Sequence, residues 1–487
     1  MRKRLRLACG LAVTAALLVT TSTAQASVIC VSATLASCEA TIADAIAAAA
    51  AGDTIALRRG VYYENVVIPP ALTGLKITGT AGSILDPGDD GLNPAPNTGV
   101  GIAIQADDVT LRGFKIRNGD TDQVTLAAGV TGTTLTGIHS LNAEESLLTS
   151  LAAGNDGTTV ERCVVHAPND GLAVISGDDV VVRGNRLSAS SSDGIDITGA
   201  NAVVSGNTLR SVENGDAISV SGANAEVVRN RITAVDSTGI RVFGANPMVV
   251  GNDIRGSYDG IDVSGDSPIV KRNRLQGIVS GGTAVDVSCT VCTDGEVSFN
   301  RVSDVGDDTE GFSISAAGAG LEVANNRATD VIDTGFYLST VNGAMIRGNR
   351  ASYIGGDEED CFDLNGDDNT LTGNFGSYCM GDGFQIDGLN NTLTRNSSMH
   401  AGENGFEIEV TSVGTTLTSN RATGNGLAGF EVQDGGAPAD QTTLERNQAR
   451  DNLADLCDEG TNTTLTSNRF GTTLAVVQDG TRDCPQF

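Results

Sequence analysis

The chain has 487 residues, of which 61 are glycine and none is tryptophan. Its 60 Asp and Glu residues outnumber 31 Lys and Arg residues, so the formal net charge is −29. This balance argues against binding to nucleic acid or to an anionic membrane, because both would repel the chain, but it is compatible with cation binding.

Residues 1–26 have the pattern of an export signal. Basic residues at 2–6 precede an apolar stretch over 7–20, and Ala24-Gln25-Ala26 has the form of a cleavage site after Ala26. No later apolar segment is long enough for a transmembrane span. The sequence therefore predicts a secreted protein, either periplasmic or extracellular, in which disulfides persist. The close spacings favour the pairs Cys30–Cys38, Cys289–Cys292, Cys361–Cys379 and Cys457–Cys484.

One short helix is predicted near the start of the mature chain. The stretch "ATIADAIAAAA" (40–50) places Ile42, Ala45, Ile46 and Ala49 at helical spacing. We expect a helix over 40–51 that caps the N-terminal end of the fold, because the ends of a stack of strands must be covered.

The rest of the chain is a repeat marked by asparagine. In each period, short runs with alternating apolar residues are separated by Gly, Asn, Asp and Ser, and no run is long enough for an amphipathic helix. Three strands and three turns in each period fit one coil of a parallel β-helix of about 17 coils, with a C-terminal cap region at 455–487. A buried asparagine in each coil would form a hydrogen-bonded ladder, and Cys163 would continue this position as a buried thiol. The repeating asparagines are Asn185, Asn207, Asn230, Asn252, Asn273, Asn300, Asn326, Asn349, Asn374, Asn396, Asn420, Asn447 and Asn468.

The N-terminal segment "TIADAIAAAAAGDTIALRRGVYYENVVI" (41–68) resembles the opening of the pectate-lyase-like superfamily of right-handed β-helix proteins. The resemblance implies a single all-β domain over 27–487, a right-handed parallel β-helix. Members of that superfamily include polysaccharide lyases, galacturonases, uronate epimerases and phage tailspikes, so the fold alone does not select an activity. The Gly-His-Gly of galacturonases and the Asp-Pro-His of uronate epimerases are both absent here.

Two stripes counted from the asparagine repeat are candidates for binding substrate. Arg301, Arg327 and Arg350 directly follow the repeating asparagine in successive coils, and arginine forks bind carboxylates. Tyr337 and Asp363 belong to a second outward stripe that is rich in acids. Two alternatives remain open: the arginines neutralise acids on the same rod, and the acidic stripe is the solvated side of a strand.

A third stripe lies four residues after the repeating asparagine, at Asp330, Tyr353, Tyr378 and His400. Tyr353, Tyr378 and His400 are candidates for catalytic proton transfer. Nearby loops add acidic residues as candidate Ca²⁺ ligands, which are Glu358, Asp360, Asp382 and Glu403. The alternative is that the aromatic residues stack at a corner for packing.

The sequence therefore predicts a protein that binds or processes an acidic polysaccharide or cell-surface glycan, with a lyase as one form of that activity. A lyase acting on uronates must abstract a proton beside a carboxylate, which the third stripe could serve. The alternative is a non-catalytic rod for surface adhesion or for the architecture of the cell envelope. The sequence selects neither a particular polymer nor an oligomeric state.

Overall fold

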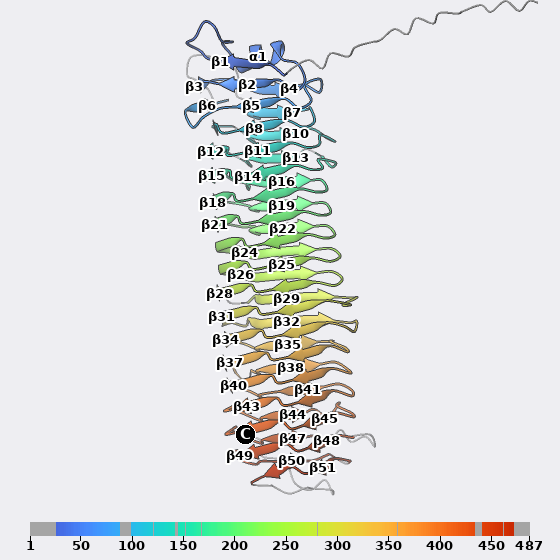
Figure 1. The fold of residues 1–487 in the computed structure, drawn as a ribbon. Coiled ribbons are helices and arrows are strands. Elements are labelled where there is room, and N and C mark those ends of the chain that lie inside the picture. The colour runs from blue at the N-terminus through green and yellow to red at the C-terminus, as the bar shows by residue number, and fades with distance from the viewer. Residues whose placement is uncertain are drawn as a thin grey trace, which may run out of the picture.

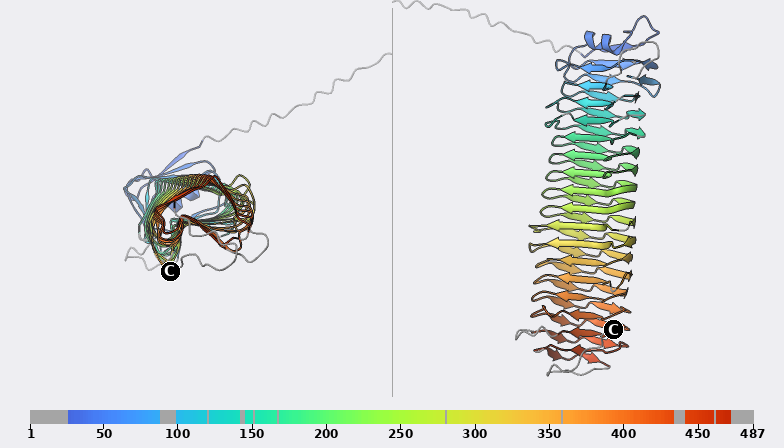
Figure 2. Two further views of the ribbon diagram at one scale, coloured as in Figure 1. Left: turned by 90° about the horizontal axis from the view of Figure 1, so that it is seen from below. Right: turned by 180° about the vertical axis from the view of Figure 1, so that it is seen from behind.

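The computed structural model describes residues 26–87, 99–119, 121–141, 145–150, 152–166, 168–279, 281–357, 359–433, 441–460 and 462–471. They form a parallel β-solenoid of about 17 turns with almost no helix, as predicted. The turns stack into a straight rod (Figure 1), and they superpose when the rod is viewed along its axis (Figure 2). At about 4.8 Å per turn the rod is roughly 80 Å long. The predicted signal peptide, the cleavage site apart from Ala26, and Cys484 lie outside the described residues.

Each turn has three short strands, which we call the first, second and third strands, counted from the repeating asparagine. In the turn that begins at Asn349, they are β37 (Arg350–Ile354), β38 (Phe362–Asn365) and β39 (Thr370–Thr372). Every strand pairs in parallel with its counterpart one turn away, as Arg327 faces Arg350 and Phe336 faces Phe362. Equivalent residues therefore form columns along the rod.

The remaining strands fall into the same three columns. The other first strands are β3 (Gly60–Tyr62), β6 (Ser83–Leu85), β9 (Lys115–Arg117), β12 (His139–Leu141), β15 (Val164–His166), β18 (Arg186–Ser190), β21 (Thr208–Val212), β28 (Arg274–Ile278), β31 (Arg301–Asp307), β34 (Arg327–Ile332), β40 (Phe375–Cys379), β43 (Ser397–Met399), β46 (Arg421–Thr423), β49 (Gln448–Arg450) and β52 (Arg469–Phe470). In β24 (Arg231–Phe243) and β26 (Asp253–Ser264), the first and second strands are continuous.

The other second strands are β4 (Val66–Ile68), β7 (Ile102–Ile104), β10 (Val124–Leu126), β13 (Leu148–Ser150), β16 (Ala173–Ser176), β19 (Ile195–Thr198), β22 (Ile218–Ser221), β29 (Thr283–Cys289), β32 (Glu310–Ala316), β35 (Phe336–Ser339), β41 (Gln385–Asp387), β44 (Phe406–Ile408), β47 (Phe430–Val432) and β50 (Cys457–Asp458). The other third strands are β1 (Val28–Val31), β2 (Thr54–Leu57), β5 (Lys76–Thr78), β8 (Thr110–Arg112), β11 (Thr134–Thr136), β14 (Thr159–Glu161), β17 (Val181–Arg183), β20 (Val203–Ser205), β23 (Glu226–Val228), β25 (Met248–Val250), β27 (Ile269–Lys271), β30 (Glu296–Ser298), β33 (Glu322–Ala324), β36 (Met345–Arg347), β42 (Thr392–Thr394), β45 (Thr416–Thr418), β48 (Thr443–Glu445) and β51 (Thr464–Thr466).

The core is filled by the inward residues of all three columns. Because side chains alternate along a strand, one residue in two points inward, and these are mainly Val, Ile, Leu and Phe. Six phenylalanines of the second-strand column lie in successive turns and stack face to face, with ring centroids 4.6–4.9 Å apart. The stack comprises Phe312, Phe336, Phe362, Phe384, Phe406 and Phe430, all of which are fully buried.

The predicted asparagine ladder is confirmed. The Asn326 backbone N–H and side-chain Nδ2 both donate to Asn349 Oδ1, at 2.9 and 3.1 Å. Nδ2 also donates to the backbone oxygen of Val297 at 2.7 Å. The same contacts run from Asn185 to Asn468 without interruption. Cys163 takes the next position toward the N-terminus, where its backbone N–H donates to Asn185 Oδ1.

The predicted disulfides Cys30–Cys38, Cys289–Cys292 and Cys361–Cys379 are confirmed. Cys163 is a buried free thiol, as predicted, and burial raises its pKa to about 12.

The predicted helix over 40–51 is present but shorter, at α1 (Ile42–Ala48). The Thr41 hydroxyl caps it by accepting from the Asp44 backbone N–H. The helix lies at the N-terminal end of the rod (Figure 1) and contacts β1, β2 and β4. Within the described residues, no helix has the length and apolar character to cross a membrane.

Candidate functional site

The outer surface of the first strands carries a row of arginines in register. Arg274 faces Arg301, Arg301 faces Arg327 and Arg327 faces Arg350. All four are exposed, because the residue after the ladder asparagine points outward while the next one points into the core. Among the described residues, none of the four lies within ion-pair distance of a carboxylate. No direct ion pair within the described part of the chain therefore holds any of these four arginines, and neutralisation of more distant acids on the same rod stays an alternative.

The row continues toward the C-terminus on the same column, and we call the whole set the arginine strip. Between Arg350 and Arg421 two turns interrupt it with Phe375 and Ser397, and Arg350 lies 5.0 Å above the Phe375 ring. The last three arginines line a surface pocket of about 420 Å³. The members of the arginine strip are Arg274, Arg301, Arg327, Arg350, Arg421 and Arg469 of this column, together with Arg450, which lies two residues along β49 from Gln448 of the column.

The arginine strip is a positive surface on a strongly acidic protein. In the four positions that follow the ladder asparagine of these seven turns there are seven arginines and three acids, which are Asp304, Asp330 and Asp451. Asp304 accepts a hydrogen bond from Gln276 at 2.6 Å, and Asp451 lies 3.8 Å from Arg450. Like charges about 4.8 Å apart repel one another, so an anion lying along the strip would relieve that repulsion.

The Tyr353, Tyr378 and His400 side chains form a stack beside the arginine strip. The ring centroids are 5.1 Å apart in both pairs, and the two tyrosine rings are parallel to within 2°. Asp330 holds the same position one turn earlier, and all four residues have a left-handed backbone with φ between 54° and 58°. Tyr353 and Tyr378 are 58% and 49% exposed, so the stack is a surface feature.

The stack leaves limited ring area for a ligand, because the rings cover one another's faces. Edges and polar atoms therefore provide most of the accessible contact surface. The His400 ring nitrogen Nδ1 lies 3.3 Å from the Gly424 backbone oxygen and donates to it in the tautomer that places the proton there. The structure brings the three predicted catalytic residues together, and their role in proton transfer stays a prediction.

Tyr337 and Asp363 lie on a different surface from the arginines, on the second strands. They face each other in register, and Gln385, Glu407 and Glu431 continue the column. Burial raises the pKa of Asp363 to about 6, with Asp387 and Glu409 adding repulsion. Burial and the neighbouring Glu407 likewise raise the pKa of Glu431 to about 7. This surface holds protonatable carboxyl groups and would repel an acidic polymer.

Asp360 and Asp382 lie in successive turns between the first and second strands. The Asp382 backbone N–H donates to Asp360 Oδ1 at 2.5 Å, and the Asn404 backbone N–H donates to Asp382 Oδ1 at 2.6 Å. Burial raises the pKa of both carboxyl groups well above the usual range, and a hydrogen bond to Glu407 raises that of Asp382 further. These two acids thus form a second, shorter side-chain ladder.

The four predicted calcium ligands do not all meet in the part of the chain that is described. Glu358 lies outside the described residues, and Glu403 lies one turn beyond Asp382, where its backbone N–H donates to Gly381. Among the described residues, no group of three His, Cys, Asp or Glu side chains is arranged to hold a metal ion. Calcium binding stays a prediction.

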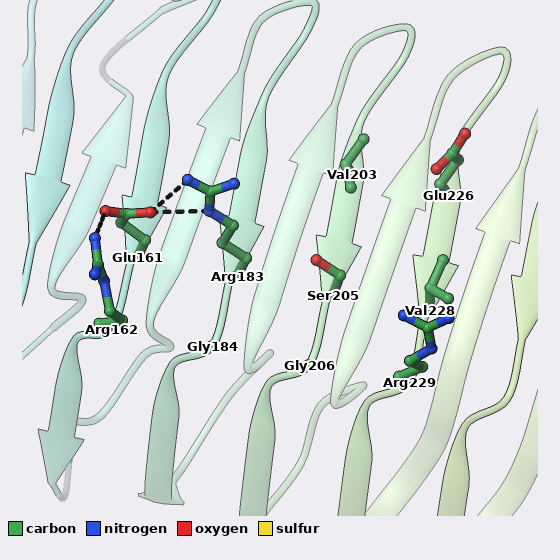
Figure 3. Close-up of a pocket in the computed structure, with 10 residues that line it drawn as sticks. All are labelled: Glu161, Arg162, Arg183, Gly184, Val203, Ser205, Gly206, Glu226, Val228 and Arg229. Atoms are coloured by element: carbon green, nitrogen blue, oxygen red, sulfur yellow. Dashed lines mark hydrogen bonds and ion pairs between the residues drawn. The ribbon is translucent and has the colours of Figure 1, made fainter.

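A pocket on the third strands was missed from the sequence. It has a volume of about 650 Å³ and lies over β14, β17, β20 and β23 (Figure 3). Three of its lining residues are Arg162, Arg183 and Arg229, with Glu161 between the first two. The sequence did contain a signal for this pocket, because the residue before the repeating asparagine is arginine in some turns and glycine in others.

The fold and the surface give the class of protein: it is a long parallel β-solenoid with columns of charged side chains on its outer surface. The sequence matches the family model described as "Right handed beta helix region" over residues 150–290, 203–328 and 293–449, and the chain belongs to this family. No curated protein sequence is significantly similar to the chain.

Several solved structures are similar at low identity. The periplasmic alginate epimerase AlgG shares 12% identity over 88% of this chain and 78% of its own, with a TM-score of 0.25. A tailspike protein of E. coli bacteriophage HK620, in complex with a pentasaccharide, shares 12% over 80% and 72%, with a TM-score of 0.38. The catalytic domain of a GH87 α-1,3-glucanase shares 12% over 91% and 69%, with a TM-score of 0.26.

Proposed function

We propose that the protein binds an acidic polysaccharide along the arginine strip. The observation that carries this proposal is the row of four in-register arginines, Arg274 to Arg350, that face no carboxylate. Arginine forks bind carboxylates in a bidentate manner. A linear polyuronate also presents charges at regular intervals, which suits a column of guanidinium groups with one member per turn.

Tyr353 lies on β37 with Arg350, and Tyr378 and His400 follow in the two turns that interrupt the strip. A polymer that extends from Arg350 toward Arg421 would therefore reach the stack. Its hydroxyl and imidazole groups can exchange hydrogen bonds with sugar hydroxyls. They are also the groups that a lyase would use to remove and return a proton. The acidic second-strand column is unsuited to this polymer, so we assign Tyr337 and Asp363 no contact with it.

The alternative is a non-catalytic rod, and the observation that favours it is the uninterrupted ladder from Asn185 to Asn468 together with the phenylalanine stack. Both features rigidify the rod without serving any chemistry. We further propose that the protein is exported, which the three disulfides support, since disulfides persist in oxidising compartments. We also propose that α1 covers the N-terminal strand edges.

The test is binding of polygalacturonate and of uncharged dextran to the purified protein at low and high salt. Replacing both Arg301 and Arg327 by glutamine should weaken binding of polygalacturonate about tenfold, because two exposed ion pairs at about 0.7 kcal/mol each are lost. The matched control replaces Arg112 and Arg395, which are exposed and lie outside the strip, and it should bind as the wild type does.

Equal weakening by the two double variants would show that only the total charge matters, and the proposal would fail. Ultraviolet absorbance of the same mixtures tests elimination, because a lyase creates unsaturated sugar ends. Tyr378→Phe keeps the stacked ring and removes its hydroxyl, so loss of product in this variant would separate chemistry from packing. No product with any polyuronate would leave the rod hypothesis in place.

A further inference from the structure

The third-strand pocket is formed by the pattern of residues that precede the ladder. Arg162 and Arg229 occupy this corner position three turns apart, and the two turns between them have Gly184 and Gly206. The space between the two arginines therefore contains no side chain from the corner. At about 4.8 Å per turn it is roughly 14 Å long, which accommodates a short oligosaccharide rather than a single small anion.

The glycines are the reason that this space is open. A Cβ atom on Gly206 would meet nothing within 4 Å, and one on Gly184 would meet only Arg162 Cγ at 3.9 Å. Both glycines have a left-handed backbone, with φ of 63° and 64°, but the conformation does not require glycine here. Arg162 and Arg229 take it with φ of 55°, so the corner tolerates large side chains.

Glu161 holds two of the arginines in place. Its side chain is nearly buried, and it accepts from Arg183 Nε and Nη2 at 2.8 and 2.6 Å and from Arg162 Nη2. Thr136 adds a hydrogen bond at 3.0 Å. Although burial raises the pKa of Glu161, the bonds from Arg162 and Arg183 lower it to about 2, so the carboxylate stays ionised. The two guanidinium groups are fixed before any ligand arrives.

The geometry leaves donors that point into the pocket. Figure 3 shows that Arg183 uses two nitrogens on Glu161, while its third nitrogen points away, toward the side of Val203. Arg229 lies on the opposite side, and among the described residues it is within ion-pair distance of no carboxylate. A ligand between Arg183 and Arg229 would therefore meet guanidinium groups from two sides, one of them pre-oriented.

The surface between these arginines is mixed in character. Val203 and Val228 are half-buried and provide an apolar floor, while Ser205 and Glu226 provide a hydroxyl and a carboxylate. Figure 3 shows Val203 and Ser205 between Arg183 and Arg229. An apolar floor suits the C–H face of a sugar ring, and the polar groups suit its hydroxyls. A bare phosphate or sulfate would use only the arginines.

We propose that this pocket binds a short oligosaccharide that carries a carboxylate, with the carboxylate on Arg183 or Arg229 and a sugar ring over Val203 and Ser205. This site is separate from the arginine strip, which begins at Arg274 on the first strands, and it does not depend on the function proposed for the strip. It gives the rod a second recognition surface that fits one end or one short segment of a glycan.

The experiment is calorimetric titration of the purified protein with trigalacturonate, with maltotriose as the uncharged trisaccharide. Gly206→Phe should fill the pocket and weaken binding of trigalacturonate at least tenfold, and Phe299 shows that the corner accepts phenylalanine at φ 56°. The matched control is Gly373→Phe at the same corner of a distant turn, where a Cβ would also meet nothing within 4 Å. It should bind as the wild type does. Arg229→Gln should weaken binding about tenfold without changing the thermal unfolding midpoint.

Unchanged binding in Gly206→Phe, or the absence of binding in the wild type, would overturn the proposal. Equal affinity for maltotriose would show that the arginines do not select the ligand. Displacement of the trisaccharide by an equal concentration of sulfate would show that the pocket binds an anion and does not recognise the sugar. The Arg301 and Arg327 double variant separates the two surfaces. It should keep its affinity for trigalacturonate whether or not it loses affinity for polygalacturonate, so the pocket and the strip can fail independently.

Discussion

Asn326→Ala tests whether the asparagine ladder holds the turns together. The Asn326 side chain donates to Asn349 Oδ1 and to the Val297 backbone oxygen, and its Oδ1 accepts from the backbone N–H and from Nδ2 of Asn300. Alanine removes all four contacts. The Asn300 N–H is then buried without a partner, which costs about 2 kcal/mol, and the other three losses add about 2 kcal/mol because their partners keep a second bond. We expect the free energy of unfolding to fall by about 4 kcal/mol.

The assay is urea unfolding followed by circular dichroism, together with hydrogen exchange of the Asn300 amide. Exchange at Asn300 should accelerate strongly, because each turn of a solenoid is stabilised by its neighbours. Ser303→Ala, on the surface of β31, is the control and should change stability by less than about 0.5 kcal/mol. A loss below about 1 kcal/mol with unchanged protection of Asn300 would refute the argument that the ladder bonds stabilise the interior.

Three further predictions concern the acidic column of the second strands, the buried thiol and the phenylalanine stack. Asp363 and Glu431 have raised pKa values of about 6 and about 7, so the folded state binds more protons than the unfolded state between about pH 4 and 7. Stability should therefore fall as the pH rises through this window, and the urea midpoint should depend less on pH in Asp363→Asn; a higher midpoint at pH 7 than at pH 5 would contradict this reasoning. Cys163 should not react with a thiol reagent until the protein unfolds, and fast labelling of native protein that disappears in Cys163→Ser would show that it is accessible. Phe384→Ala should cost about 3–5 kcal/mol in urea unfolding, because the ring is stacked between neighbours at 4.7 and 4.8 Å, and a loss below about 1 kcal/mol would mean that the stack is loosely packed.

The fold could be predicted from the sequence because its period is set by a single residue type. Because each turn buries one hydrogen-bonded asparagine, this residue recurs once per turn in the sequence. Counting from it places each outward column correctly. The register of Arg301, Arg327 and Arg350 follows from that count alone, as does the stack of Tyr353 with Tyr378. Column membership is a property of the backbone, and the backbone here is regular.

Counting residues from the asparagine does not predict which groups each side chain contacts. Whether Arg301 faces an acid depends on side-chain direction across a corner, and the position of Asp382 depends on a turn whose length varies. The phenylalanine stack could have been predicted from the sequence, since a phenylalanine recurs in six successive turns. The pocket between Arg162 and Arg229 was harder to predict, because it is made by glycines, where a side chain is missing.

Because the ladder fixes each turn at its asparagine, the number of residues in a turn does not affect the position of that turn in the stack. Successive ladder asparagines are 21 residues apart at Asn252–Asn273 and 27 apart at Asn273–Asn300, yet the hydrogen bonds between them are of the same length. Extra residues are therefore absorbed in the corners, away from the interior. Insertions at a corner can add new surface without disturbing the rod, and whole turns can be gained or lost between two asparagines. The molecule behaves as an extensible scaffold whose decoration can change independently of its frame.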